Sequence, residues 1–162
     1  MAPNKTRAIK LTLHRHVLVT LNVYCGIMHT SGDEAVNAAL GSRVIDMVNE
    51  QTPAFQTEYY RLFAAPEPPV KGAGNWHIDV PGLYPEPNVG EAGLSLPLTK
   101  IVFRVTPAAE LRLRTFSAMT GEPLSSVAHR AIRRQVRHIM GRTPEDWAAF
   151  WGAFRLAWKQ AQ

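Results

Sequence analysis

The strongest constraint on the fold is segment 100–136, which reads KIVFRVTPAAELRLRTFSAMTGEPLSSVAHRAIRRQV. Its first six residues alternate between two sets of side chains. In an extended chain such alternation places the two sets on opposite faces, so a strand is predicted over 100–105. One face would carry Ile101, Phe103 and Val105, and the other would carry Lys100, Val102 and Arg104.

Two helices are predicted directly after this strand. Thr106-Pro107 supplies a hydroxyl N-cap and a proline at the first helical position, and Gly121 supplies a stop. After the short turn Gly121-Glu122-Pro123, apolar residues return at helical spacing with arginines between them. The apolar positions of the two helices are Ala109, Leu113 and Phe116, then Val127, Ala128, Ile132 and Val136.

This strand–helix–helix order resembles the ribbon-helix-helix family of DNA-binding proteins. The resemblance covers about 37 residues and rests on the strand, on Thr106-Pro107 and on the run from Gly121 to Leu124-Ser125. It implies that two such units pair their strands into an antiparallel ribbon above four helices, and that the ribbon enters the major groove. A lone strand needs such a partner because its backbone groups must be hydrogen-bonded.

A second unit with the same order occupies residues 8–48. Its first helix is expected to end at Thr30-Ser31-Gly32 and to be about a turn longer than its counterpart. Thr52-Pro53 and Thr143-Pro144 then each introduce an aromatic helix. These two starts, and the aromatic residues that follow them, are separated by 91 positions. We therefore interpret the chain as a tandem repeat over about 8–63 and 100–158. The alternative is one true unit beside an unrelated αβ segment.

The predicted fold is mainly α with a two-stranded antiparallel ribbon, a tandem ribbon-helix-helix pseudo-dimer in one chain. Its parts would be 1–63, a Pro/Gly-rich connector over 64–99, and 100–162. A tandem arrangement is similar to the TraY-like accessory proteins of conjugative relaxosomes and to the single-chain accessory proteins of T-DNA transfer. The resemblance thus implies a DNA-processing accessory factor that assists a relaxase at a transfer origin. A transcriptional repressor of the same fold is the alternative.

The resemblance also implies which residues touch DNA. Outward strand residues would read base edges, with arginine or lysine suited to guanine and small apolar groups to a thymine methyl. The N-terminus of the second helix would hold a backbone phosphate. In the first unit the acids of Gly32-Asp33-Glu34 would weaken that clamp and make the half-sites asymmetric. The expected base contacts are Ala8, Lys10, Thr12, Lys100, Val102 and Arg104; the expected phosphate contacts are Gly121, Ser125, Ser126 and Arg130.

Charge supports a polyanionic partner. The chain has 18 basic and 13 acidic residues, a net charge of +5. Residues 100–162 hold eleven basic and four acidic residues, a net +7, so DNA binding should be led by this half. For the arginines of the second helix a merely solvated basic face is an equal alternative; these are Arg130, Arg133, Arg134 and Arg137.

Other classes find little support in the sequence. No apolar run of about 18 residues and no apolar leader is present, so a cytoplasmic protein is expected. The single Cys25 is expected to be a buried structural thiol. The histidines His14, His16 and His29 fit no closed zinc site, and no phosphate-binding glycine loop, HExxH or GxSxG motif occurs. We therefore expect no enzyme, metal or cofactor.

The C-terminal aromatic segment offers an interpretation from a different class of function, that of a protein-interaction module. The segment 143–160 carries an aromatic stripe at helical spacing, which is either core packed on the helices of its own unit or a face that docks a protein partner. A membrane-surface role is disfavoured by the few basic residues on its polar side. The candidate partner-binding residues are Trp147, Phe150, Trp151, Phe154 and Trp158.

Overall fold

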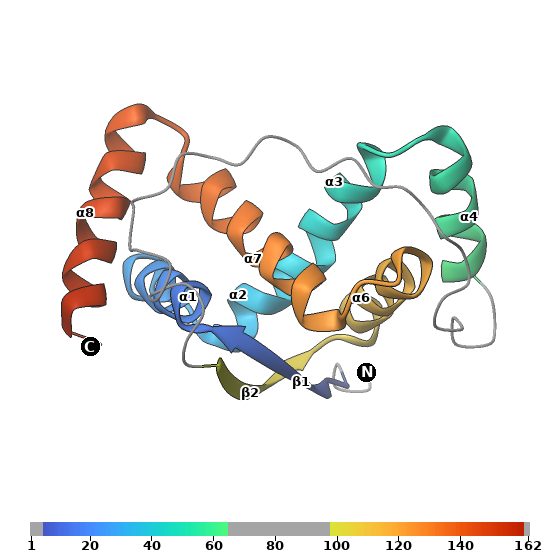
Figure 1. Cartoon of the computed structure of the whole chain (residues 1–162), viewed down its shortest axis with the longest axis horizontal. Coiled ribbons are helices and arrows are strands. Elements are labelled where there is room, and N and C mark those ends of the chain that lie inside the picture. The colour runs from blue at the N-terminus through green and yellow to red at the C-terminus, as the bar shows by residue number, and fades with distance from the viewer. Residues whose placement is uncertain (1–4, 65–97, 161–162) are drawn as a thin grey trace.

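The computed structural model describes residues 5–64 and 98–160 (Figure 1). The first part contains β1 (Arg7–His14), α1 (Arg15–Met28), α2 (Gly32–Ala38), the π-helical η1 (Ala39–Arg43), α3 (Val44–Asn49) and α4 (Pro53–Phe63). The second part contains β2 (Leu98–Val105), α6 (Pro107–Thr120), α7 (Leu124–Met140) and α8 (Pro144–Gln160). The predicted class, mainly α with a two-stranded antiparallel sheet, is confirmed. The predicted connector lies almost wholly outside the described residues.

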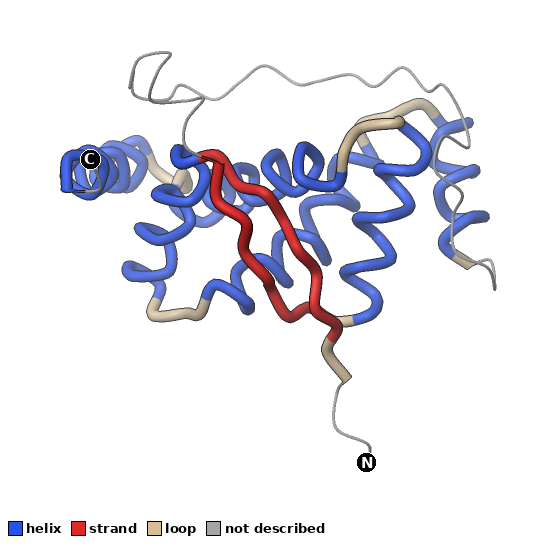
Figure 2. The backbone as a smooth tube through the Cα atoms, turned by 60° about the horizontal axis from the view of Figure 1, so that its bottom comes forward, coloured by secondary structure: helices blue, strands red, loops and turns tan. Residues whose placement is uncertain are grey.

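The two strands pair with each other along their whole length. Figure 2 shows β1 and β2 as a narrow ribbon across one side of the helices. Lys10 lies opposite Val102. Strand β1 extends one residue beyond each end of the predicted 8–13, and β2 begins two residues before the predicted 100–105 and ends with it. The predicted faces are confirmed, because the apolar sides of both strands turn toward the helices. The inward residues are Ile9, Leu11, Leu13, Ile101, Phe103 and Val105, all buried except the half-buried Ile101.

Helix α6 begins and ends where its sequence predicts. The Thr106 hydroxyl accepts a hydrogen bond from the Ala109 N–H at 3.2 Å, and Pro107 occupies the first helical position. Gly121 ends the helix in the left-handed region, with φ at 76°. A side chain at that φ would be strained, so the glycine is required there for conformational reasons.

Helix α1 ends differently from its prediction. It stops at Met28, and His29 takes the left-handed conformation with φ at 53°. The Ser31 hydroxyl accepts from the Glu34 N–H at 3.1 Å, so Ser31 begins α2 and Gly32 lies inside that helix. The prediction that Gly32 stops the first helix was wrong, because a serine N-cap leaves the following glycine helical. The predicted extra turn is also absent, since α1 and α6 both have 14 residues.

The second helical run of the first part is interrupted by a π-helical turn. Segment η1 lies between α2 and α3, and the Gly41 carbonyl accepts a hydrogen bond from the Arg112 guanidinium at 2.6 Å. A π turn holds one more residue than the α turn it replaces. Consistent with that, α6 begins 92 positions after α1, whereas α8 begins 91 positions after α4.

The aromatic helices at the two ends of the molecule pack across the chain. Helix α4 lies against α3 and α6, and α8 lies against α1 and, less extensively, α7 (Figure 1). The stripe on α8 is therefore core, but core shared mainly with the opposite half rather than with its own unit as predicted. Partner docking through this stripe is not supported, because its rings are covered within the chain. Phe150, Trp151, Phe154 and Trp158 are buried, and Trp147 is partly buried against them.

Candidate nucleic-acid interface

The outer face of the ribbon gathers the predicted base-contacting residues on one surface. The strand register sets Ala8 beside Arg104, Lys10 beside Val102, and Thr12 beside Lys100. Each of these three rows holds one cationic side chain and one uncharged neighbour. The face is open, because Thr12 alone is half-buried and even the apolar Val102 is 55% exposed. Exposure of a valine at the centre of a strand leaves its methyl groups available for contact.

Each edge of the ribbon is closed by a side chain from the first turns of a helix. The Ser125 hydroxyl of α7 accepts a hydrogen bond from the Thr12 N–H at 2.9 Å. On the other edge, the Asp33 carboxylate of α2 accepts from the Arg104 N–H at 3.0 Å. These bonds satisfy backbone donors that a two-stranded ribbon leaves without a neighbouring strand. Asp33 was expected only to weaken a phosphate clamp, and its role in holding β2 was missed.

The predicted phosphate contacts divide into two groups. Gly121 and Ser126 are exposed around the start of α7, and Ser125 lies there at the ribbon edge. Pro123 is the N-cap of α7, with no side-chain hydrogen bond. Arg130 differs, because both of its contacts to the Glu122 carboxylate measure 2.7 Å and its guanidinium lies over the Phe116 ring. Arg130 therefore fastens α7 to the α6–α7 turn in this structure, and its contact with a phosphate stays a prediction.

Other arginines of α7 are also engaged within the fold. Arg134 forms a bidentate ion pair with Glu50 at 2.6 and 2.8 Å, which joins the two halves of the chain. Arg137 lies 4.8 Å from the centre of the Trp147 ring and donates to the Gly141 carbonyl. These arginines of α7 thus contribute largely to packing within the fold. The cationic groups of the ribbon are the better candidates for DNA.

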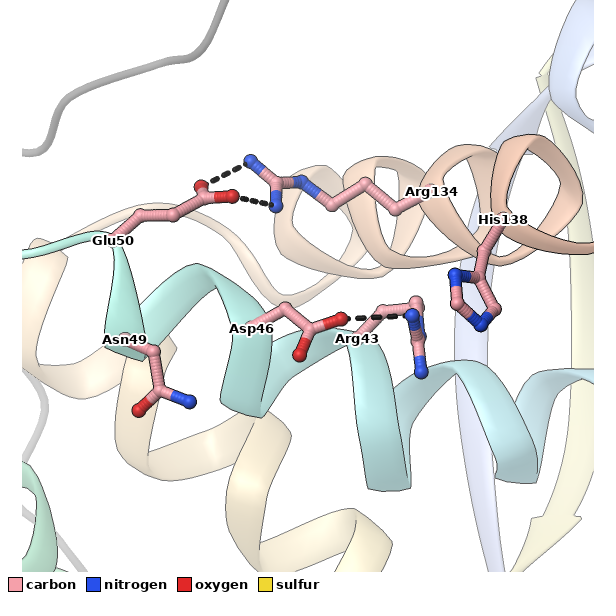
Figure 3. Close-up of a pocket in the computed structure, with 6 residues that line it drawn as sticks. All are labelled: Arg43, Asp46, Asn49, Glu50, Arg134 and His138. Carbon is pink, nitrogen blue, oxygen red and sulfur yellow. Dashed lines mark hydrogen bonds and ion pairs between the residues drawn. The ribbon is translucent and has the colours of Figure 1, made fainter. Parts of the chain in front are cut away.

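A polar pocket of about 320 Å³ lies between η1, α3 and the C-terminal half of α7 (Figure 3). Arg43 pairs with Asp46 at 2.8 Å, and Arg134 pairs with Glu50 across the two helices. Because these charges neutralise each other, the pocket resembles a polar seam between helices more than a ligand site. Figure 1 places α3 and the end of α7 on the side opposite the ribbon. The complete lining is Arg43, Asp46, Asn49, Glu50, Arg134 and His138.

A histidine pair lies where β1 passes into α1. The His14 and His129 rings are 4.9 Å apart, and the second of these was not singled out from the sequence. Burial, the charge of His14 and that of Arg133 lower the pKa of His129 to about 4, against a hydrogen bond to the Thr12 backbone that raises it. His129 is therefore neutral at physiological pH. The place of His129 in the sequence did not predict its contact with His14, because that contact depends on where α7 crosses β1.

Metal-ligating side chains form no cluster among residues 5–64 and 98–160. No three histidine, cysteine or carboxylate side chains of this part converge on a common point. His16 is buried among aromatic rings of α8, 5.0 Å from that of Phe154. Cys25 is half-buried, and burial with the nearby Glu34 raises the pKa of its thiol, which disfavours the nucleophilic thiolate. None of these described helices is long and apolar enough to cross a membrane.

Comparison with known proteins adds no relative. Neither a family model, nor a curated protein, nor a solved structure matches this chain.

Proposed function

We propose that the protein is a tandem ribbon-helix-helix chain that binds double-stranded DNA in the major groove. The observation that carries this proposal is the exposed outer face of the ribbon, with Lys10, Lys100 and Arg104 in successive rows. Arginine and lysine are the side chains best suited to guanine edges, and cationic groups also attract the DNA backbone. The helices beneath the ribbon leave that face uncovered (Figure 2).

The dimensions of the ribbon suit the groove. Two strands about 4.8 Å apart, with their side chains, fit a groove about 12 Å wide. Successive outward residues on a strand are about 6.8 Å apart, so the three rows span about 14 Å, or about four base pairs at 3.4 Å each. A short core site with guanines near its ends is the expected target.

The equal lengths of α1 and α6 and the equivalent hydrogen bonds at the two ribbon edges support the tandem arrangement. Thr12 and Arg104 are 92 positions apart, and so are the acceptors of the opposite edges, Asp33 and Ser125. The same offset relates outward residues of unlike chemistry, pairing Ala8 with Lys100, Lys10 with Val102, and Thr12 with Arg104. A chain whose halves present different side chains should prefer a site that is not palindromic.

One polypeptide that supplies both strands suits an asymmetric site, which is the arrangement of the accessory factors of plasmid and T-DNA transfer that the sequence resembles. We therefore propose an accessory role in which the bound chain assists a relaxase near a transfer origin. The fold alone is shared with repressors of transcription, so the biological role is tested separately from DNA binding.

Selection from random double-stranded DNA at moderate salt, followed by the mass of the complex, tests the proposal. One chain on a short asymmetric site is expected. Arg104→Ala should weaken binding to the selected site by about 1–3 kcal/mol and relax one base position. Arg155→Ala removes the same charge from the exposed side of α8, away from the ribbon, and should leave site preference unchanged. Failure to select any DNA, or equal effects of the two variants, would refute readout by the ribbon.

A further inference from the structure

The two edges of the ribbon are closed by different chemistry at equivalent places. Asp33 holds the β2 edge through the Arg104 N–H, and Ser125 holds the β1 edge through the Thr12 N–H. Both bonds have the same function in the fold, since each satisfies one outward backbone donor. They differ in charge, because one acceptor is a carboxylate and the other a neutral hydroxyl. An amide or hydroxyl oxygen at this position could also accept the hydrogen bond, without the charge.

The surroundings extend this difference along each edge. Glu34 follows Asp33 and accepts from the Thr30 hydroxyl, and Asn37 accepts from the Thr106 N–H at 2.8 Å. The β1 edge instead has the His14–His129 pair, with Arg133 close enough to lower the pKa of His129. The β2 edge is therefore acidic to neutral, and the β1 edge is neutral to basic.

We propose that the charge of Asp33 confines close contact with the DNA backbone to the β1 edge of the ribbon. This inference rests on the proposed function. A ribbon lying in the major groove has a DNA backbone along each of its edges. Phosphates passing the β2 edge meet the carboxylate of Asp33, whereas those passing the β1 edge meet Ser125 and the start of α7. Backbone contact is consequently one-sided in either orientation of the chain on its site.

The variant Asp33→Asn separates the charge from the hydrogen bond, because the amide keeps an oxygen that can accept from the Arg104 N–H. Binding to the selected DNA should become about threefold to tenfold tighter at moderate salt as one further phosphate is approached, and the salt slope should steepen by about 0.9. Hydroxyl-radical footprinting should change from protection on one flank of the site to protection on both. The mirror variant Ser125→Asp should bind at least tenfold more weakly and lose the existing flank.

An unchanged salt slope and an unchanged one-sided footprint in Asp33→Asn would overturn the inference and leave Asp33 as a purely structural acceptor. Selection of no DNA by the unmodified chain would instead overturn the proposed function, and this inference with it. Circular dichroism and melting of both variants establish that the ribbon is intact. If Asp33→Asn does not fold, loss of the protected flank in a folded Ser125→Asp supports one-sided contact, and its retention overturns it.

Discussion

At the scale of single residues, similar arginines have dissimilar roles. Arg130 and Arg134 face carboxylates of Glu122 and Glu50, and Arg112 donates to the carbonyl at the π turn. Arg104 is exposed on the ribbon, and only its backbone is held by Asp33. Charge patterning predicts a basic surface, but it does not show which arginines are neutralised: Glu122 is eight residues from Arg130, and Glu50 is 84 residues from Arg134. Which arginines can meet a polyanion is therefore a property of the folded chain.

His129 should make stability depend on pH. Its pKa in the folded chain, about 4, is below the ordinary value of 6.5, so the unfolded chain takes up the proton first as pH falls. Stability should decline between about pH 6.5 and pH 4 and change no further from this cause below pH 4. The full shift corresponds to about 3 kcal/mol, and screening of this partly exposed ring reduces it to about 1–2 kcal/mol.

Denaturant unfolding of His129→Asn at pH 7 and pH 4.5 measures this contribution. Asparagine is the residue at the corresponding place of the first half, Asn37, which hydrogen-bonds the Thr106 backbone there. The variant should lose about 1–2 kcal/mol less than the parent chain between the two pH values. His138→Asn, on the same helix at the polar pocket, is the control. An unaltered pH dependence in His129→Asn would contradict the assignment.

At the scale of elements, the last described helix, α8, stabilises the first helix, α1. Helix α8 covers α1, and its rings surround His16, while Arg15 lies 5.4 Å from the centre of the Trp158 ring. The aromatic period predicted an amphipathic helix and a buried stripe. It contained no information on which helix would cover the stripe, because any apolar surface of suitable width satisfies it.

Phe154→Ala tests this packing. The side chain is fully buried between His16, Trp151 and Trp158, so truncation should lower the free energy of unfolding by about 3–5 kcal/mol. Leu156→Ala, two residues further along the helix, removes a side chain that is 65% exposed and should cost no more than about 0.5 kcal/mol. Equal midpoints of urea unfolding for the two variants would show that α8 does not dock on α1.

At the scale of the whole molecule, the two halves share one interior. A single cluster of buried side chains includes both strands and helices from both halves, and the outer helices α4 and α8 each cover an element of the opposite half. Neither half has a complete core of its own in this arrangement. The chain should therefore unfold as one cooperative unit.

Two probes of one denaturant titration test this cooperativity. Trp147, Trp151 and Trp158 all lie on α8, so in a Trp76→Phe background their fluorescence reports one end of the molecule. Far-UV circular dichroism reports helices from both halves. Coincident midpoints are expected. A fluorescence transition that clearly precedes or follows the dichroism transition would show that the halves unfold separately.

Local signals in the sequence predicted several elements correctly and others wrongly. The strand alternation, the Thr106-Pro107 start and Gly121 determined α6 and the ribbon faces, because each acts through the backbone or the side chains of immediate neighbours. The end of α1 was mispredicted because His29, a residue without a strong terminating signal, adopts the left-handed conformation. The π turn was not predicted either, since its carbonyl at Gly41 is satisfied by a distant arginine.

The sequence by itself determined the inward and outward faces of both strands, the caps of α6 and the amphipathic stripe of α8, since these follow from the periods of a strand and a helix. Only the tertiary structure decided the pairing register, the partner of α8, the neutralisation of the α7 arginines and the contrast between Asp33 and Ser125 at the ribbon edges. The physical reason is the distance along the chain over which each kind of interaction acts. Periodicity and capping act within a few residues, whereas hydrogen bonds and ion pairs between the two halves exist only once the ribbon has closed.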